Sequence, residues 1–263
     1  MPSWFHEIYV KNAAIYQPVL EAGLKTAPDE ARGLSKIFSK YGVKKGSRVL
    51  DVSCGIGRHS INLAKLGYEV VGYDLSPYFL RTARNLAKKA RAKNIRFVQG
   101  DTSNLSKILG GESKFDAIIC MDSSFMRDKR SEEIALLRAM RKLAKEKCIL
   151  VIETFNRELY IKQFQHFWIQ SFPRNIERHS FFQPYDHKKK RYGAEWRFYK
   201  RQRDKSLKHL LSLRFEARAQ SKEDLKSLVR RTGWRCLRNY GSVSRLERFS
   251  PDSFHIVMIC GTK

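Results

Sequence analysis

The stretch Val49-Leu50-Asp51-Val52-Ser53-Cys54-Gly55-Ile56-Gly57-Arg58-His59-Ser60 decides the fold of this 263-residue chain. An apolar, β-branched run leads directly into a turn with two glycines, and a helical pattern begins just after it. Gly55 and Gly57 allow the backbone to approach a ligand, because no Cβ stands in the way. The amides at the helix start would present positive dipole ends to that ligand. On its own, the pattern also fits a turn that needs glycine only for its geometry.

Apolar runs that suit β-strands alternate with helical patterns from residue 47 to residue 154. Ser76-Pro77 predicts one helix, with an N-cap residue followed by a proline in the first turn. Another helix is expected to open at Ser131, because Glu132 and Glu133 then fill its first turn. The alternation predicts an α/β fold, a Rossmann-like, mostly parallel seven-stranded sheet with helices on both faces. The expected strands are residues 48–52, 69–73, 95–98, 115–121, 148–153, 234–240 and 254–260.

The rest of the chain differs from this core. The N-terminal part has a helical pattern, with Leu34, Ile37 and Phe38 as a buried stripe. A middle segment is aromatic and basic, and it predicts an insertion of helix and antiparallel strands. Beyond it, Ser221 caps a helix that Gly233 stops. The expected segments are a helical cap at 1–45, the cofactor-binding core at 46–154, a substrate-facing insertion or lid at 155–215, and the C-terminal completion of the sheet at 216–263.

Acidic residues stand at the ends of four expected strands. They are Asp51, Asp74, Asp101 and Asp122, in chain order. In an open parallel sheet the carboxyl ends of the strands converge on one crevice. Asp74 lies seventeen residues beyond Gly57, where an acidic side chain can accept hydrogen bonds from both ribose hydroxyls of a nucleoside. The sequence therefore predicts a nucleoside site at this edge of the sheet.

Nicotinamide dinucleotides compete for this assignment, because their fingerprint also combines a glycine turn with a later acid. That fingerprint has glycine at a third position, where this chain has Ser60. Asp51 also precedes the turn, where a pyrophosphate would be repelled and an ammonium group attracted. These residues favour S-adenosylmethionine, which carries an amine and a carboxylate but no phosphate.

The run from Asp51 to Gly57 is similar to the first motif of the class I S-adenosylmethionine-dependent methyltransferases. Asp74, Asp101-Thr102 and Met121-Asp122 resemble their second, third and fourth motifs. The chain also resembles small archaeal members of this superfamily whose substrates are unassigned, through its tail from residue 240 to residue 260. The similarity covers roughly residues 35–155 and 220–263. This similarity identifies the cofactor but gives almost no information about the acceptor.

The resemblance implies a role for each motif residue. The glycine turn would line the methionine end of the cofactor, with Asp51 near the amine through water. Asp74 would hold the ribose, and Leu75 would pack on the adenine. Asp101 would accept a hydrogen bond from the adenine amino group, and the backbone amide of Thr102 would donate one. The Met121 carbonyl oxygen would accept a hydrogen bond from the amine of the cofactor. The full expected cofactor set is Asp51, Ser53, Gly55, Ile56, Gly57, Asp74, Leu75, Asp101, Thr102, Met121 and Asp122.

One departure concerns the turn before the fifth strand. Many relatives carry Lys-Pro-Gly-Gly there, whereas this chain has Lys145-Glu146-Lys147. The change is expected to alter that turn and to leave the site intact.

Methyl transfer from a sulfonium mainly requires alignment of donor and acceptor and exclusion of water. A general base helps only when the acceptor carries a proton. Glu153, Asn156 and His59 are placed to act as that base, although each of them is more often structural. No metal site is expected, and the product of the cofactor would be S-adenosylhomocysteine.

The residues after the fourth strand narrow the choice of acceptor. Enzymes that methylate base amines in DNA usually carry Asn/Asp-Pro-Pro-Tyr/Phe there, but this chain has Met121-Asp122-Ser123-Ser124-Phe125. Cytosine-C5 enzymes need a cysteine nucleophile, and Cys120 lies inside an apolar run that indicates a core thiol. Neither class is supported.

Twelve aromatic residues between positions 160 and 200 and ten Lys or Arg between 188 and 208 mark the insertion. An aromatic lid over an N or O nucleophile of a small molecule explains the aromatic half best. The alternative is an RNA-directed methyltransferase that docks polynucleotide on the basic half. A cofactor-binding protein without catalysis is the third hypothesis.

The net charge of +26 keeps RNA open as a partner. No apolar run is long enough to span a bilayer, no signal peptide is recognisable at the N-terminus, and no membrane partner is expected. Five cysteines without CxxC spacing indicate free thiols and a cytoplasmic protein. The oligomeric state cannot be read from the sequence.

Overall fold

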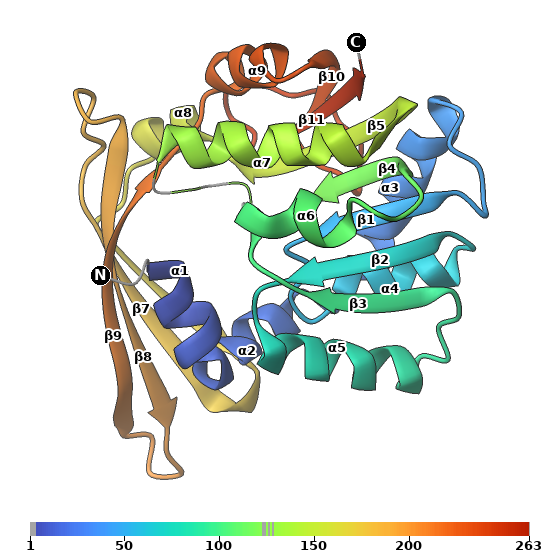
Figure 1. Ribbon diagram of the computed structural model, residues 1–263. Coiled ribbons are helices and arrows are strands. Elements are labelled where there is room, and N and C mark those ends of the chain that lie inside the picture. The colour runs from blue at the N-terminus through green and yellow to red at the C-terminus, as the bar shows by residue number, and fades with distance from the viewer. Residues whose placement is uncertain (1–3, 123–124, 126, 128, 263) are drawn as a thin grey trace.

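The computed structural model describes residues 4–122, 125, 127 and 129–262. Two parts of the chain that the sequence analysis used lie outside the described residues. They are Met1 to Ser3, in the segment expected to lack a signal peptide, and Ser123 and Ser124, in the fourth motif. The described chain forms one seven-stranded sheet and one four-stranded sheet. Two N-terminal helices, α1 (Trp4–His6) and α2 (Ala13–Ala22), lie in the space that separates the two sheets (Figure 1).

The first strand of the seven-stranded sheet, β1 (Arg48–Val52), lies between β4 and β2. Leu50 and Val52 are buried in one core cluster and Val49 in another, so the strand is covered on both faces. Only β11 runs antiparallel to its neighbours, which confirms the expected mostly parallel Rossmann-like sheet. The spatial order is β10 (Trp234–Tyr240), β11 (His255–Thr262), β5 (Ala144–Phe155), β4 (Phe115–Cys120), β1, β2 (Glu69–Asp74) and β3 (Ile95–Gln99).

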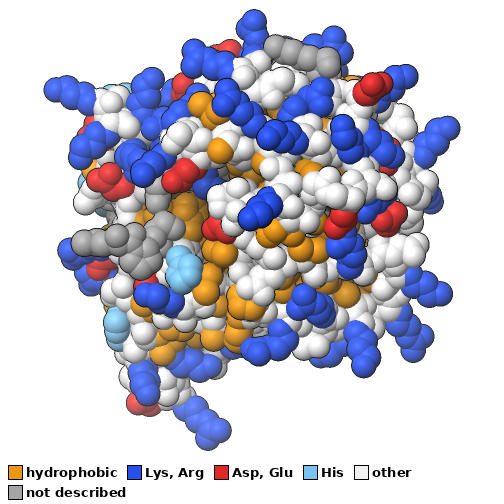
Figure 2. Space-filling view, in the orientation of Figure 1, with side chains coloured by type: hydrophobic (Ala, Val, Ile, Leu, Met, Phe, Trp, Pro, Cys, Tyr) orange, Lys and Arg blue, Asp and Glu red, His pale blue; other side chains and the backbone are white. Residues whose placement is uncertain are grey.

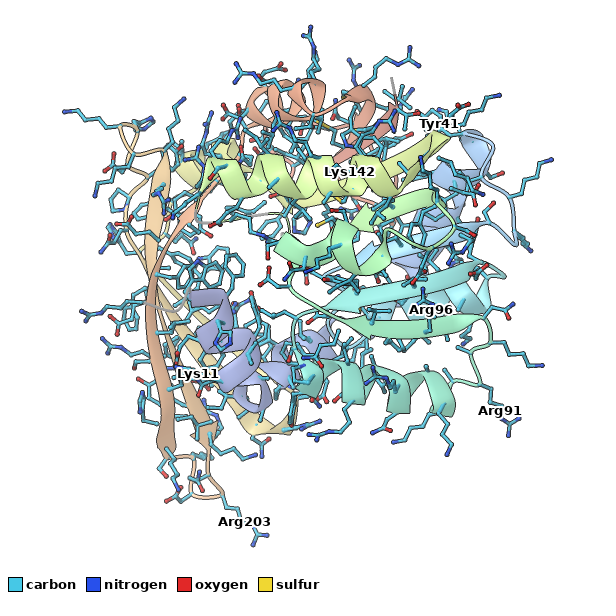
Figure 3. All side chains as sticks on the ribbon, in the orientation of Figure 1. Lys11, Tyr41, Arg91, Arg96, Lys142 and Arg203 are labelled. Atoms are coloured by element: carbon cyan, nitrogen blue, oxygen red, sulfur yellow. The ribbon has the colours of Figure 1, made fainter. Side chains whose placement is uncertain are left out.

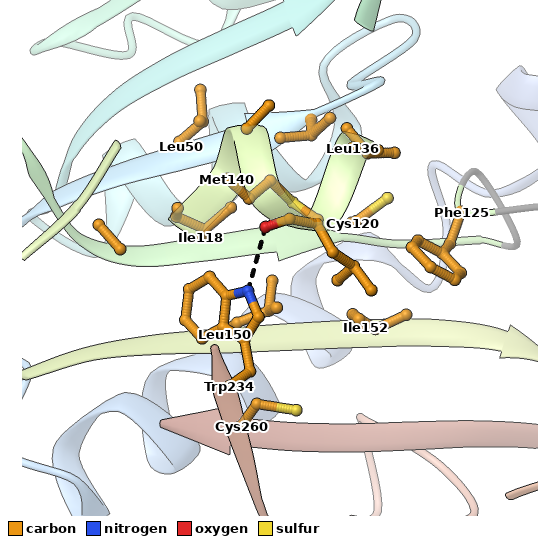
Figure 4. Packing of buried hydrophobic residues seen from close by; sticks show 14 of the residues in the cluster. Leu50, Ile118, Cys120, Phe125, Leu136, Met140, Leu150, Ile152, Trp234 and Cys260 are labelled. Carbon is orange, nitrogen blue, oxygen red and sulfur yellow. Dashed lines mark hydrogen bonds between the residues drawn. The ribbon is translucent and has the colours of Figure 1, made fainter. Parts of the chain in front are cut away.

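Helices cover both faces of this sheet. Trp234 is fully buried among the helices of one face, and its indole Nε1 donates to the Leu137 carbonyl oxygen at 3.1 Å (Figure 4). On the other face Leu34, Ile37 and Phe38 are buried, as the helical stripe predicts. The first face carries α6 (Leu105–Leu109), α7 (Arg130–Leu143) and α9 (Lys222–Arg231), and the second carries α3 (Ala27–Lys40) and α4 (Arg58–Lys65), with α5 (Pro77–Lys89) packed beside β3.

Two of the three predicted helix starts are confirmed. The Ser76 side chain accepts from the Phe79 amide at the start of α5, and Ser221 caps α9. The expected start of α7 at Ser131 is wrong, since the helix begins at Arg130. The Lys129 backbone is extended and its carbonyl accepts from the Glu132 amide at 3.1 Å, so helical hydrogen bonding already starts there.

Strand β5 begins earlier than residue 148. Ala144 is buried and pairs with Phe115 of β4, directly after the last residue of α7. Lys145-Glu146-Lys147 therefore lies in the strand, and the expected separate turn is absent. The pairing needs a register shift between Phe115 and Ala117, which accommodates the extra residues.

The four-stranded sheet is antiparallel throughout and is formed by the aromatic, basic stretch. Phe198 is fully buried on the face that packs against the N-terminal helices, together with Ile8 and Tyr16. Helix α3, by contrast, packs on the larger sheet. The elements of this part are α1 (Trp4–His6), the π-helix η1 (Glu7–Lys11), α2 (Ala13–Ala22), α8 (Arg157–Lys162), β6 (Phe167–Phe172), β7 (Ile176–Phe182), β8 (Arg191–Arg201) and β9 (Leu207–Arg218), with 3₁₀ turns at Pro173–Asn175 (η3) and, near β3, at Thr102–Asn104 (η2).

Positive charge is spread over the surface. Figure 2 shows Lys and Arg over the whole visible face, while hydrophobic side chains gather towards its middle. In Figure 3, Arg91 and Arg203 extend outward from opposite parts of the molecule, and Arg96 and Lys142 belong to two further elements. None of the helices in residues 4–122 and 129–262 is long and apolar enough to cross a membrane.

Candidate functional site

A cavity of about 990 Å³ is lined by residues from both sheets and from the N-terminal helices. Ser53, Asp74, Asp101, Asp122 and Glu153 line it from the carboxyl ends of five neighbouring strands of the larger sheet. The convergence expected from the parallel topology is therefore present. We call this side of the cavity the core wall.

The two glycines of the turn have different tasks. Gly55 lines the cavity at φ +56°, and a Cβ there would meet only the Leu20 Cδ1 atom, at 3.4 Å, among the described residues. The backbone at Gly55 is thus open to a ligand. Gly57 lines no part of the cavity, and a Cβ there would come within 2.9 Å of the Phe97 ring. Gly57 is needed for the packing of helix against strand, which the sequence pattern could not separate from ligand approach.

A side pocket of about 50 Å³ extends behind the turn. Asp51, Ile56, His59 and Met121 are among its lining residues. Burial raises the pKa of Asp51, and its Oδ2 atom accepts from Ser60 Oγ at 2.5 Å. The pocket is polar on one side and fits the end of a small ligand that carries an amine.

Asp74 is the best-defined acid of the core wall. Its Oδ2 atom accepts from the Gly55 amide and its Oδ1 atom from the Ser76 amide, both at 2.8 Å. Burial raises the pKa of Asp74 to about 6, against those hydrogen bonds, which lower it. Each carboxylate oxygen keeps a lone pair for a further donor. Asp74 can therefore hold a hydroxyl pair while it fixes the glycine turn.

Leu75, Asp101 and Thr102 also line the cavity, beside Asp74. The Asp101 Oδ1 atom accepts from the Ser103 amide at 2.8 Å, and the side chain is exposed. The Thr102 Oγ1 atom accepts from Arg127 Nη2 at 3.3 Å. This region combines one apolar side chain with polar groups at the rim, which suits a planar base.

A network that the sequence analysis did not assign surrounds Arg58. Its guanidinium pairs with Glu30 of α3 and lies 3.7 Å from Asp122 Oδ2. His59 Nε2 lies 2.7 Å from the same Glu30 carboxylate. Burial opposes ionisation of Glu30, but the His59 hydrogen bond and the Arg58 charge outweigh it and lower the pKa of Glu30 to about 2. Arg58 stands inside the glycine motif, so its position was visible, but its partner on a distant helix was not.

The three candidate bases differ in environment. Glu153 lines the cavity, accepts from the Asp122 amide at 3.3 Å and lies 3.6 Å from His255 Nδ1. Asn156 is fully buried outside the cavity, caps α8 and donates to the Pro251 and Ser253 carbonyls at 2.9 Å, which favours a structural role. His59 is buried against Glu30 and lines only the side pocket.

Cys120 is a core thiol, as expected from the apolar run. It is fully buried and pairs with Ile152 of the neighbouring strand (Figure 4). Burial raises the pKa of Cys120 to about 12, so the thiol is not a nucleophile at neutral pH. All five cysteines are free.

The opposite side of the cavity comes from residues 155–215 and from residues 4–22 of the first N-terminal helices, and we call it the insertion wall. Aromatic side chains dominate it, with Trp4 stacked on Phe215 at a centroid distance of 4.5 Å and Tyr16 facing Trp196 at 6.0 Å. The sequence predicted the aromatic insertion but not the N-terminal contribution, because no local pattern links segments so far apart. The lining aromatic residues are Trp4, Phe5, Tyr9, Tyr16, Phe79, Phe155, Tyr160, Trp168, Phe182, Tyr192, Trp196, Phe215 and Phe254.

Solved structures with this fold include two that match almost the whole chain. A S-adenosylmethionine-dependent methyltransferase from Clostridium acetobutylicum has a TM-score of 0.76 and 19% identity over 96% of this chain and 98% of its own. CalS10, a SAM-bound amino pentose methyltransferase from Micromonospora echinaspora, has a TM-score of 0.70 and 18% identity over 93% of this chain and 97% of its own. At these identities the likeness shows the fold alone.

Curated relatives match the core by sequence. A glycine/sarcosine N-methyltransferase from Parasynechococcus marenigrum is 37% identical over 36% of this chain and 33% of its own length. A ubiquinone biosynthesis O-methyltransferase from Xanthomonas oryzae is 33% identical over 43% of this chain and 44% of its own. The matched part thus spans less than half the length of either relative.

A family model described as a methyltransferase domain matches residues 43–227, which is more than half of the chain. The match includes the glycine turn, all four acidic strand ends and the four-stranded sheet. Together with the fold and the cavity, it supports the resemblance seen in the motifs. The chain therefore belongs to the methyltransferase domain family, within the class I S-adenosylmethionine-dependent methyltransferases.

Proposed function

We propose that this chain transfers the methyl group of S-adenosylmethionine to an N or O nucleophile of a small-molecule acceptor. One observation carries the proposal: a single cavity joins the core wall, with its glycine turn and acidic strand ends, to an aromatic insertion wall. A cofactor held by the first wall would face an acceptor held by the second. The relatives that act on N and on O atoms leave the choice of atom open.

The residues of the core wall fit the cofactor of the family. Gly55 offers an open backbone, Asp74 offers two carboxylate oxygens for the ribose, and the side pocket beside Asp51 suits the amine. Met121 lines that pocket, and its carbonyl oxygen is the proposed acceptor of a hydrogen bond from the amine. The bound cofactor supplies an activated methyl group, and the protein contributes alignment and exclusion of water.

Glu153 is the candidate to receive a proton from the acceptor. It is nearly buried, it lines the cavity and it lies at the end of β5 next to Asp122. A carboxylate at that position can accept a proton from an amine or a hydroxyl as the new bond forms. His255 beside it keeps the carboxylate oriented.

RNA as the acceptor is the second candidate, supported by the net charge of +26 and by the basic turn at residues 188–190. Lys188, Lys189 and Lys190 are exposed, and none of them lines the cavity. The N-terminal helices and the insertion line the cavity with aromatic side chains, which supports a small acceptor over a polynucleotide. Five free cysteines support a cytoplasmic location, where thiols stay reduced.

The decisive experiment combines binding and turnover. Calorimetry should give micromolar S-adenosylhomocysteine binding and no detectable NAD binding. A panel of small amines, phenols and carboxylates, with transfer RNA and ribosomal RNA beside it, is then screened for labelled methyl incorporation. Incorporation into a small molecule supports the proposal, and incorporation only into RNA selects the second candidate. Cofactor binding without incorporation into any acceptor would favour a non-catalytic binding protein.

A further inference from the structure

Arg178 is the charged residue of the insertion wall. It lies on β7, and its guanidinium stacks over the Trp196 ring at 4.5 Å from the centroid and near the Phe172 ring at 5.4 Å. The side chain also donates from Nη2 to Gln170 Oε1. These contacts fix the guanidinium in one place at the cavity surface.

The charge of Arg178 lacks an acidic partner among the described residues. No described carboxylate oxygen lies within 4.0 Å of it, and its Nε atom is buried without a hydrogen-bond partner. Its neighbours on the outer face of the same sheet behave differently, since Arg197 pairs with Glu195 and Arg201 with Glu177. A buried donor without an acceptor destabilises the folded protein, so its retention needs a reason.

The two walls carry opposite charge. Every residue from 155 to 218 is described by the structure, and in that range Arg178 is the only charged residue that lines the cavity. On the facing side the acids, among them Asp122 and Glu153, outnumber Arg58 and Arg127. An anionic group on an acceptor would be repelled by the core wall and attracted to Arg178, so charge alone would orient the molecule.

Two phenols lie next to Arg178, and they interact with each other. Burial raises the pKa of Tyr9 and of Tyr16, so both hydroxyls stay protonated at neutral pH. The Tyr16 ring lies 5.1 Å from the Tyr9 ring and 6.0 Å from the Trp196 ring. A guanidinium beside a phenolic hydroxyl, within an aromatic surround, is suited to an oxyanion attached to a flat apolar body.

We propose that Arg178 binds a carboxylate or phosphate group of the methyl acceptor, which is therefore a small anion with a flat apolar body. This inference rests on the proposed function, in which the insertion wall binds the acceptor and the core wall binds the cofactor. Arg178 then determines which acceptors enter and how their nucleophilic atom is turned towards the core wall.

The test uses the full chain saturated with S-adenosylhomocysteine and four probes: benzoate, phenyl phosphate, benzamide and benzylammonium. Ligand-observed NMR titration gives the dissociation constant of each. Benzoate or phenyl phosphate should bind at least about tenfold more tightly than the neutral and cationic probes. The stronger of the two anions identifies a carboxylate or a phosphate as the recognised group.

Arg178→Met should remove that preference, and Arg178→Lys should keep part of it. Arg197→Met is the matched control, because Arg197 stacks on Phe181 at 4.6 Å in the same sheet but does not line the cavity. An unchanged preference in Arg178→Met, or no preference in the wild type, overturns the inference.

Affinity for S-adenosylhomocysteine separates the two proposals. It should be the same in all three variants, which also verifies that they fold. Loss of S-adenosylhomocysteine binding in Arg178→Met alone would assign Arg178 to the carboxylate of the cofactor and overturn the inference, while the proposed function would stand. Absence of S-adenosylhomocysteine binding in the wild type would overturn the proposed function itself.

Discussion

The core wall and the insertion wall share one cavity but are built on different principles. The core wall gathers consecutive strand ends of a parallel sheet, so its acids are brought together by topology alone. The insertion wall depends on antiparallel strands that meet an N-terminal segment more than 150 residues away, as in the stacking of Trp4 on Phe215. Among the described residues, six acids line the cavity and all lie outside the insertion wall: Glu30, Asp74, Asp101, Asp122, Glu132 and Glu153.

This difference teaches how the fold divides its tasks. The core wall is part of a large two-faced hydrophobic core, whereas the insertion wall packs only through its inner face. Under the proposed function, the polar core wall binds the cofactor, which is the same for every acceptor, and the aromatic insertion wall binds the acceptor. Substitutions on each side of the cavity can test this division, from the largest expected effect to the smallest.

Trp234→Ala should destabilise the whole protein most. The side chain is fully buried, and its loss removes both packing and the hydrogen bond to the Leu137 carbonyl. We expect a loss of about 3–5 kcal/mol in the free energy of unfolding, measured by urea denaturation. Trp196→Ala in the insertion wall is the matched variant and should cost clearly less. Equal losses would show that the two walls unfold as one unit.

Gly55→Val should abolish cofactor binding while the fold persists. The residue has φ +56°, a region that β-branched side chains avoid, and the new side chain would point into the cavity. We expect affinity for S-adenosylhomocysteine to fall by more than about 100-fold in calorimetry. Gly42→Val is the control, because Gly42 has φ +82° and open space around it. Similar binding loss in both variants would assign the effect to backbone strain.

Asp74→Asn should weaken S-adenosylhomocysteine binding by about 10- to 100-fold, since a charged acceptor for the ribose hydroxyls is lost. The pKa of Asp74 is raised to about 6, so in the wild type affinity should also fall as the pH drops from 7.5 to 5. The variant should lack this pH dependence. An identical pH profile in both proteins would contradict the assignment of Asp74.

The raised pKa of Asp74 also makes the stability of the protein depend on pH. Between the ordinary value of 3.8 and about 6, the folded protein holds a proton on Asp74 that the unfolded chain has lost. The contribution of Asp74 to stability therefore falls as the pH rises through this interval and is constant above it. Thermal unfolding of the wild type and of Asp74→Asn without ligand, compared at pH 4.5 and pH 7, measures the difference.

Replacing Lys188, Lys189, Lys190 and Arg191 together by Ser should have the smallest effect. None of these residues lines the cavity, so S-adenosylhomocysteine affinity should not change. RNA binding should be weak in both proteins. If RNA is the acceptor, the salt slope of filter binding should instead fall by roughly 0.7 for each lost contact. A matched variant with Lys88, Lys89, Arg91 and Lys93 replaced by Ser separates a local docking site from a general effect of charge.

The core wall could be predicted from sequence because its signals are local. The glycine turn, Asp74 and Asp101 each come directly after an apolar run, and parallel topology brings such ends together. The start of β5 at Ala144 could not be predicted, since a charged run continues as a strand only because Ala144 pairs with Phe115. The roles of these residues towards a cofactor remain predictions.

For the insertion wall, the sequence could predict only the amino-acid composition and not the contacts. Its aromatic residues were visible, but Arg178 was one of many basic residues in the sequence. What distinguishes it is the absence of a described carboxylate nearby and its position between two rings, and both depend on strand register. Likewise, the pairing of Arg58 with Glu30 depends on the packing of α3 against α4.

The place of β11 has a consequence for the synthesis of the protein. This strand is the last in chain order among the described strands, yet it pairs with β5 on one side and β10 on the other. While a ribosome is still translating residue 255, the hydrogen-bonding edge of β5 is uncovered and β10 has no neighbour in the sheet. Nascent chains of this length thus expose strand edges that favour aggregation until β11 is inserted.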